Sequence, residues 1–154
     1  MTTKDRKYLS DSEIIELDSA FFDSYHENVC KVAVENFKTD GELVTIIIGH
    51  AKGEAKLTKV IDKNLTVEAP KIMQLLEDLE ITSYSFVSEG RMRVPNRQNK
   101  VPVIVISSHN RSDDSRTTIY RIQSRKNKKI SLFATGEQDD HVWNYLFKKE
   151  RVLQ

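Results

Sequence analysis

The first forty residues carry apolar side chains at intervals of three or four positions. Residues 10–13 (SDSE) have the composition and spacing of a helix capping box, and the apolar stripe follows them directly. The stripe contains Ile14, Leu17, Phe21, Tyr25, Val29, Val32, Ala33 and Phe37. Residues 39–41 (TDG) end it with turn-forming side chains and a glycine. The pattern predicts one long amphipathic helix from residue 10 to about residue 40.

Short apolar runs rich in β-branched residues follow this helix. Such runs are too short for helices and are typical of strands. They lie at residues 43–48, 57–61, 81–87, 101–106, 117–124 and 129–133. The run at 101–106 is almost continuously apolar, so we expect it in the interior of the sheet.

Two further segments have helical character. Pro70 suits the first position of a helix, because a proline lacks the amide hydrogen that would be unpaired there. The apolar face of this helix would hold Ile72, Met73, Leu75, Leu76 and Leu79. A last helix is predicted from about Gln138, with acidic residues near its start and basic residues near its end.

The resulting order of elements is α-β-β-α-β-β-β-β-α. Consecutive strands without intervening helices favour an α+β fold with a long N-terminal helix and a mainly antiparallel sheet of five to six strands. We expect the helices on one face of that sheet. The chain has no repeat and no glycine- or proline-rich linker, so residues 1–154 are predicted to form a single domain.

Composition restricts the class of protein. Val, Ile, Leu and Phe supply 43 of the 154 residues, which is enough for a folded core despite the 31% of charged residues. The chain has no apolar run of membrane-spanning length and no secretory signal, so we expect a cytoplasmic protein without membrane contact. The single cysteine, Cys30, excludes an internal disulfide and a zinc ribbon, and we expect it to be a small buried side chain.

The net charge of +1 conceals two halves of opposite sign. Residues 1–90 contain 10 basic and 17 acidic residues, a net charge of −7, whereas residues 91–154 contain 14 and 6, a net charge of +8. This distribution favours an anionic partner for one surface, or a homodimer in which the acidic helix meets a basic loop. The alternative is that the two halves neutralise each other within one fold.

Two basic segments are expected to meet in space. If the last four strands form a meander, the connections at residues 90–100 and 125–128 share one end of the sheet. We predict an anion-binding surface there, made of Arg91, Arg93, Arg97, Lys100, Arg125, Lys126, Lys128 and Lys129. Arginine and lysine side chains bind phosphate or carboxylate oxygens, and neither loop holds an aromatic residue for base stacking. The alternative is a hairpin tip whose lysines only keep the protein soluble.

The opposite end of the sheet offers a second kind of chemistry. Residues 107–116 (SSHNRSDDSR) combine a histidine, two carboxylates and several hydroxyls after a buried strand. A metal-dependent hydrolase or nuclease would use Asp113, Asp114 and His109, with Glu89 as a further carboxylate. However, the sequence contains no EF-hand, HExxH or P-loop motif. We therefore assign no catalytic residue, no metal ligand and no cofactor.

The first helix itself carries a third hypothesis. The side away from its apolar stripe is acidic and holds Glu13, Glu16, Asp18, Asp23, Glu27 and Glu35. Such a face is normally solvated, but it can also imitate the charge of a nucleic acid, as in a protein inhibitor. The histidines His26, His50 and His141 are far apart in sequence, and we expect each to be a surface histidine or a hydrogen-bonded structural one rather than a ligand.

Several short segments together resemble a loose pattern of small bacterial and phage proteins that have no assigned activity. They are residues 86–90, residues 95–97, the strand at 103–106 and the hairpin around Arg121. The resemblance implies an accessory protein of a phage or mobile element, and it implies no site residue. The function expected from the residues is a non-enzymatic binding protein whose partner is a nucleic acid or an acidic protein.

Overall fold

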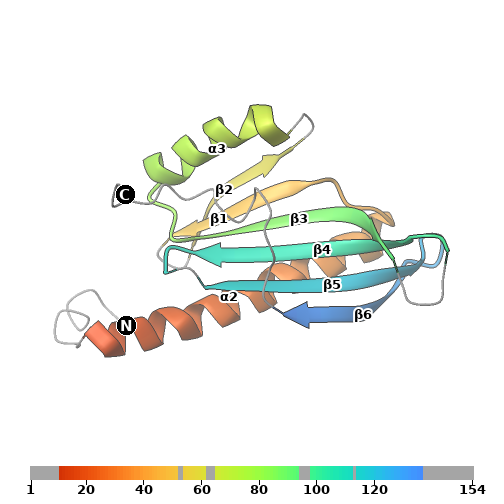
Figure 1. Ribbon diagram of the computed structural model, residues 1–154, viewed down its shortest axis with the longest axis horizontal. Helices are drawn as coiled ribbons and strands as arrows, with labels where there is room; N and C mark the ends of the chain where they lie inside the picture. The colour runs from red at the N-terminus through yellow and green to blue at the C-terminus, as the bar shows by residue number, and fades with distance from the viewer. Residues whose placement is uncertain (1–10, 52–53, 62–64, 94–97, 113, 137–154) are drawn as a thin grey trace.

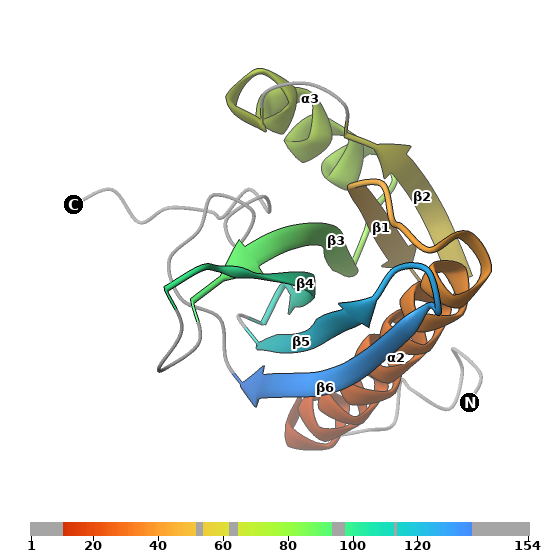
Figure 2. The same ribbon diagram turned by 90° about the vertical axis from the view of Figure 1, so that its right-hand side faces the viewer.

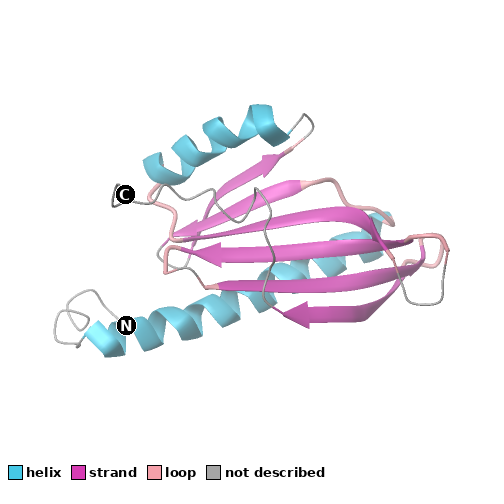
Figure 3. Ribbon diagram, viewed as in Figure 1, coloured by secondary structure: helices cyan, strands magenta, loops and turns pink. Residues whose placement is uncertain are grey.

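The computed structural model describes residues 11–51, 54–61, 65–93, 98–112 and 114–136 (Figure 1). Two helices and six strands make up this described part, and Figure 3 distinguishes them by colour. In chain order they are α2 (Asp11–Asp40), β1 (Ile46–Ala51), β2 (Glu54–Val60), α3 (Leu65–Asp78), β3 (Ser83–Met92), β4 (Val101–Asn110), β5 (Ser115–Ser124) and β6 (Lys129–Gly136). The capping-box serine and the helix predicted from residue 138 lie outside the described residues.

The six strands form one sheet in the order β2-β1-β3-β4-β5-β6. Every neighbouring pair is antiparallel, and β3 to β6 follow one another as a meander, as the sequence predicts. The helix α3 connects β2 to β3, which lie on the two sides of β1. The α+β class and the antiparallel sheet are therefore confirmed.

The two helices cover opposite faces of the sheet, so the prediction of helices on one face is wrong (Figure 2). Residues Ile46 and Ile48 of β1 pack with the core beneath α2, whereas Ile47 between them packs with α3. Successive side chains of a strand point to opposite faces. The continuous apolar run of β1 therefore contributes to two separate cores, one under each helix.

The buried face of α2 is rotated relative to the predicted stripe. Phe22 is buried, whereas Phe21 and Val32 have exposed fractions of 65% and 48%. The residues of α2 that face the sheet are Phe22, Tyr25, His26, Val29, Cys30, Ala33 and Phe37. This face includes a histidine, which an apolar pattern does not count. The helix ends as predicted, and Gly41 follows it with a φ of 77°.

The second helix begins earlier than Pro70, so the prediction of Pro70 at its first position is wrong. Helix α3 starts at Leu65, and Pro70 is inside it. The proline removes the backbone hydrogen bond to the carbonyl of residue 66. Burial of Ile72 and Leu76 against the sheet offsets this loss. Leu79, expected on the apolar face, follows the helix and is 39% exposed.

The strands β4 and β5 are longer than the apolar pattern indicates. The predicted ten-residue connection at 107–116 shortens to residues 111–114, because β4 continues to Asn110 and β5 begins at Ser115. His109 therefore belongs to a strand, where it pairs with Tyr84 of β3 and Ser115 of β5. The polar side chains of this part of the sheet, such as Ser108 and His109, are buried.

Candidate anion-binding site

The two basic segments lie at the same end of the sheet. Strand β3 ends at Met92, which pairs with Val101 at the start of β4. Val103 of β4 pairs with Arg121 near the end of β5, and the turn at residues 125–128 follows. Both connections are on the right in Figure 1, beside the C-terminal end of α2. The antiparallel register thus brings together residues separated by about thirty positions in the chain.

Two of the predicted cations are attached to the end of α2. Arg125 donates hydrogen bonds of 2.6 and 3.2 Å to the carboxylate of Glu89, and one of 3.4 Å to the carbonyl of Gly41. Lys128 donates a 2.7 Å hydrogen bond from Nζ to the carbonyl of Thr39. These contacts place positive charge at the negative end of the helix dipole. Arg125 and Lys128 therefore hold the turn against the helix.

Glu89 is the carboxylate that opposes the basic loops, and it is itself neutralised. Its carboxylate accepts a 2.7 Å hydrogen bond from the amide of Leu43 in addition to those from Arg125. Burial raises the pKa of Glu89, but the hydrogen bonds from Arg125 and Leu43 outweigh it and leave the pKa below its ordinary value. Glu89 is thus ionised, and its charge is matched by that of Arg125.

The remaining predicted cations within the described part face solvent. Arg91, Arg93, Lys100, Lys126 and Lys129 are exposed. None of the ion pairs between described residues includes any of these five side chains. Arg97 lies outside the described residues. The predicted set of eight therefore divides into two structural cations, five exposed cations and one that the structure does not describe.

An open groove of about 1040 Å³ lies between the two basic segments. Its lining residues are Gln98, Asn99, Lys100, Val101, Pro102, Arg121, Ile122, Gln123 and Lys129. Lys100 and Lys129 belong to the predicted set, whereas the sequence analysis did not assign Arg121 to it. The signal that identifies Arg121 is the alternation along β5, because its neighbours Tyr120 and Ile122 pack beneath α2 and Arg121 does not.

The structure does not bring Glu89 to residues 107–116, where the hydrolase hypothesis needs it. Asn110 Oδ1 accepts hydrogen bonds from the amides of Ser112 and Asp114, and Asn110 Nδ2 donates one to the Asp114 carboxylate. Glu89 pairs with Ile104, five residues along β4 from His109, which is about 16 Å at the usual strand rise. Asp113 is outside the described residues. Among the residues that the structure describes, no group of three or more His, Cys, Asp or Glu side chains could hold a metal ion.

His109 is buried on the face of the sheet away from α2. Its ring lies 5.1 Å from that of Tyr84, and its Nε2 is 2.8 Å from Ser107 Oγ. Burial, together with the charge of His26, lowers the pKa of His109 to about 4. A neutral, enclosed imidazole of this kind joins neighbouring side chains and does not reach solvent.

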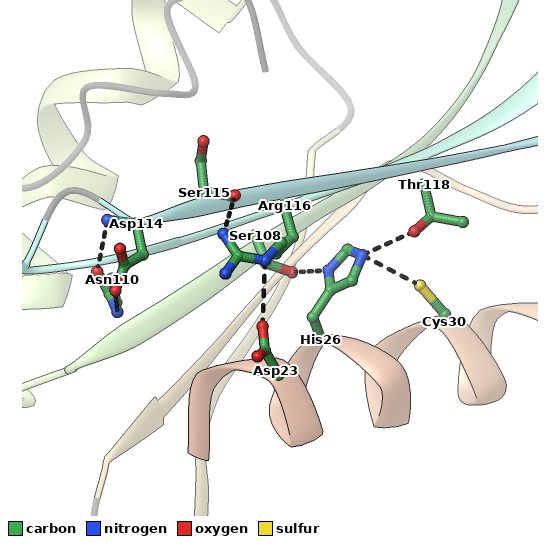
Figure 4. Close-up of polar contacts among 9 residues, drawn as sticks. All are labelled: Asp23, His26, Cys30, Ser108, Asn110, Asp114, Ser115, Arg116 and Thr118. Atoms are coloured by element: carbon green, nitrogen blue, oxygen red, sulfur yellow. Dashed lines mark hydrogen bonds and ion pairs between the residues drawn. The ribbon is translucent and has the colours of Figure 1, made fainter. Parts of the chain in front are cut away.

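A buried polar network, which the sequence analysis missed, joins α2 to the sheet (Figure 4). His26 Nδ1 is 2.6 Å from Ser108 Oγ, and His26 Nε2 is 2.8 Å from Thr118 Oγ1. Ser108 Oγ is 2.6 Å from Ser85 Oγ, which donates to the hydroxyl of Tyr25 at 2.7 Å. The only signal in the sequence is a histidine at a helical interval from buried positions.

The chemistry of this network is that of a structural contact. Ser108 is fully buried and His26 is 7% exposed, so a substrate does not reach the serine–histidine pair. Burial, followed by the charge of Arg116, lowers the pKa of His26 to about 4. Burial also raises the pKa of Cys30, whose thiol is 3.5 Å from His26 Nε2. Burial thus favours the uncharged thiol of Cys30 and the uncharged imidazole of His26, as expected where a helix packs against a sheet.

The acidic helix is partly engaged with its own sheet. Asp23 accepts a 3.1 Å hydrogen bond from Arg116 Nε, and the Arg116 guanidinium lies 5.7 Å from the centre of the Phe22 ring. Asp23 remains exposed, whereas Arg116 is half-buried. Glu27 and Glu35 are also exposed. The acidic surface predicted for an inhibitor is therefore reduced by one carboxylate near its middle.

The described residues define an α+β protein with a six-stranded antiparallel sheet and one helix on each face. Comparison with family models, curated proteins and solved structures gave no match in any of the three. The resemblance to small bacterial and phage proteins therefore stays a prediction from the sequence. Neither helix of the described part is long and apolar enough to cross a membrane.

Proposed function

We propose that this chain is a non-enzymatic binding protein of the cytoplasm that presents the basic end of its sheet to an anionic macromolecule. The observation that supports this most directly is the division of charge at that end. Arg125 and Lys128 attach the turn at residues 125–128 to the end of α2, and Arg125 forms an ion pair with Glu89. The other described cations of the predicted set are exposed to solvent. Exposed guanidinium and ammonium groups that form no ion pair with a described residue attract phosphate and carboxylate groups.

The rigidity of the surface also favours binding. Arg91 is in β3 and Lys129 in β6, and Lys126 is in the four-residue turn between β5 and β6. A sheet fixes the spacing of such groups, so less conformational entropy is lost when a partner binds. The same end includes the terminus of α2, which Gly41, Arg125 and Lys128 attach to the turn. A homodimer, in which the acidic helix of one copy occupies this surface of another, stays a prediction.

The proposal is tested by measuring the binding of polyanions to the full chain at 50 and 200 mM salt. Duplex DNA, single-stranded DNA and poly-L-glutamate serve as probes. The test variant replaces the five exposed cations with glutamine, namely Arg91, Arg93, Lys100, Lys126 and Lys129. A control variant replaces four basic residues away from this end, namely Lys31, Lys56, Lys59 and Lys71.

We expect the unmodified protein to bind at least one probe, with an affinity that decreases as salt increases. The five-residue variant should lose this binding, and the control should retain it. Absence of binding to all three probes at 50 mM salt would contradict the proposal. Equal loss in the two variants would also contradict it, because net charge and not the surface would then be responsible.

A further inference from the structure

The groove between the basic segments opens on the face of the sheet away from α2. Tyr120 and Ile122 pack with the core beneath α2, so the alternation of β5 turns Arg121 and Gln123 to the other face. Gln123 donates a 3.1 Å hydrogen bond to Ser131 of β6, which pairs with Arg121. The groove and the Glu89–Arg125 ion pair therefore belong to different faces, and no described carboxylate lines the groove.

Three cations in the groove come from three adjacent strands. Lys100 directly precedes β4, Arg121 is in β5, and Lys129 begins β6. Arg121 pairs with Val103 and with Ser131, so the three cations are within three residues of one another along the strands. Two strand spacings of about 4.8 Å and a similar distance along the strands give a patch about 10 Å across.

The size of this patch matches the charge spacing of a nucleic-acid duplex. A duplex carries one negative charge for about every 1.7 Å of its axis, so 10 Å of duplex presents about six phosphates. About half of them face a protein on one side. Three cations can therefore each meet a phosphate, while the amides of Gln98, Asn99 and Gln123 can donate to further phosphate or sugar oxygens.

The lining distinguishes a duplex from a single strand. Proteins that bind single strands stack the bases on aromatic side chains, with about 1–3 kcal/mol for each stacked base. None of the nine described residues that line the groove is aromatic. The bases of a duplex are already stacked inside it, and its phosphates point outward, so the cations and amides of the groove can bind it without aromatic side chains.

We infer that the groove lined by Lys100, Arg121 and Lys129 binds the phosphodiester backbone of a nucleic-acid duplex, without selection of base sequence. This inference rests on the proposed function and names its partner. An acidic polypeptide is the less suitable ligand, since a flexible chain would lose conformational entropy when it becomes ordered on an open surface. A duplex is stiff over the length of the groove and loses little.

The test uses the full chain and fluorescently labelled DNA of mixed sequence, as a 16-base-pair duplex and as one of its strands. The groove variant is Lys100→Gln/Arg121→Gln/Lys129→Gln. Two matched controls remove the same charge elsewhere: Arg91→Gln/Arg93→Gln/Lys126→Gln at the same end of the sheet, and Lys31→Gln/Lys59→Gln/Lys71→Gln away from it. Thermal melting of each variant establishes that it is folded.

With three phosphates neutralised, log K should decrease with log salt at a slope of about −2.7, which is about 40-fold between 50 and 200 mM. The duplex should bind more tightly than the single strand and than poly-L-glutamate. The groove variant should weaken duplex binding more than tenfold and flatten the slope, and the control away from the basic end should do neither.

The outcomes separate this inference from the proposed function. If the variant at Arg91, Arg93 and Lys126 loses duplex binding while the groove variant keeps it, the basic end binds anions but the groove does not. Tighter binding of the single strand or of poly-L-glutamate would likewise contradict the inference that the ligand is a duplex. It would leave the proposed function intact. Absence of binding to every probe would overturn both.

Discussion

The Nδ1 atom of His26 lies 2.6 Å from the Oγ atom of Ser108, and this contact joins helix α2 to strand β4 across 82 residues of the chain. His26 reaches Thr118 of β5 through its other ring nitrogen. One imidazole therefore connects the helix to two adjacent strands. Because both ring nitrogens have partners, the interface holds a polar side chain without an unpaired group.

Ser108→Ala is expected to destabilise the protein by about 1–3 kcal/mol, because it leaves His26 Nδ1 and Ser85 Oγ without a shared partner in a buried site. The midpoint and slope of urea unfolding measure the change. Ser88→Ala serves as the control, since Ser88 is a half-buried serine in the neighbouring strand β3. Equal stability of the two variants would show that the network contributes nothing to folding.

Acid should destabilise the protein through His26 and His109. Both have a pKa lowered from 6.5 to about 4 in the folded state, so the unfolded chain binds more protons between these two values. The stabilisation by the neutral imidazoles is complete above pH 6.5 and is lost as the pH falls toward 4. Each histidine should lower the free energy of unfolding by about 2 kcal/mol at pH 5, relative to its value above pH 6.5.

This pH dependence is measured by urea unfolding at pH 7.5, 6.0 and 5.0. His26→Gln should be less stable than the unmodified protein at pH 7.5, and its stability should change less between pH 7.5 and pH 5.0. NMR titration of the two imidazoles gives their pKa values directly. A His26 pKa near 6.5 in the folded protein would contradict the buried, neutral state.

Glu80→Gly is expected to stabilise the protein by about 0.5–1 kcal/mol. Glu80 follows α3 with a φ of 53°, where its amide donates to the carbonyl of Glu77 and the amide of Ile81 donates to that of Leu76. This is the hydrogen-bond pattern of a Schellman motif, whose left-handed position favours glycine. Thermal melting of Glu80→Gly beside Glu80→Ala separates backbone strain from removal of the carboxylate, since the alanine variant should give no such gain.

Gly49→Ala should destabilise the protein by about 1–3 kcal/mol. A Cβ atom at Gly49 would lie 3.1–3.3 Å from the side chain of Ile81, which is fully buried between α3 and the sheet. Because Ile81 is buried, its side chain or the backbone beside it must move by a few tenths of an ångström within a packed core. The double variant Gly49→Ala/Ile81→Val removes one of the contacting methyl groups and should recover part of the loss. No recovery would indicate that the close approach to Ile81 is not the cause.

The common location of the two basic segments at one end of the sheet could be predicted from the sequence. The meander of β3 to β6 follows from four apolar runs without helices between them, and antiparallel pairing alone brings residues 90–100 and 125–128 to one end. Antiparallel pairing of apolar runs does not determine the partners of individual cations. Arg125 pairs with Glu89 because β3 and β5 both flank β4 and Gly41 ends α2 beside them. That neighbourhood exists only in the folded sheet.

The sequence by itself determined the class of the fold, the long first helix, the number of strands and the separation of charge along the chain. These depend on local periodicity, and periodicity is a property of neighbouring residues. Only the tertiary structure decided that α2 and α3 cover opposite faces, that His26 is buried and that Arg121 joins the groove. Each of these depends on which face of a strand or helix is covered, and distant segments decide that by burying their own apolar surface.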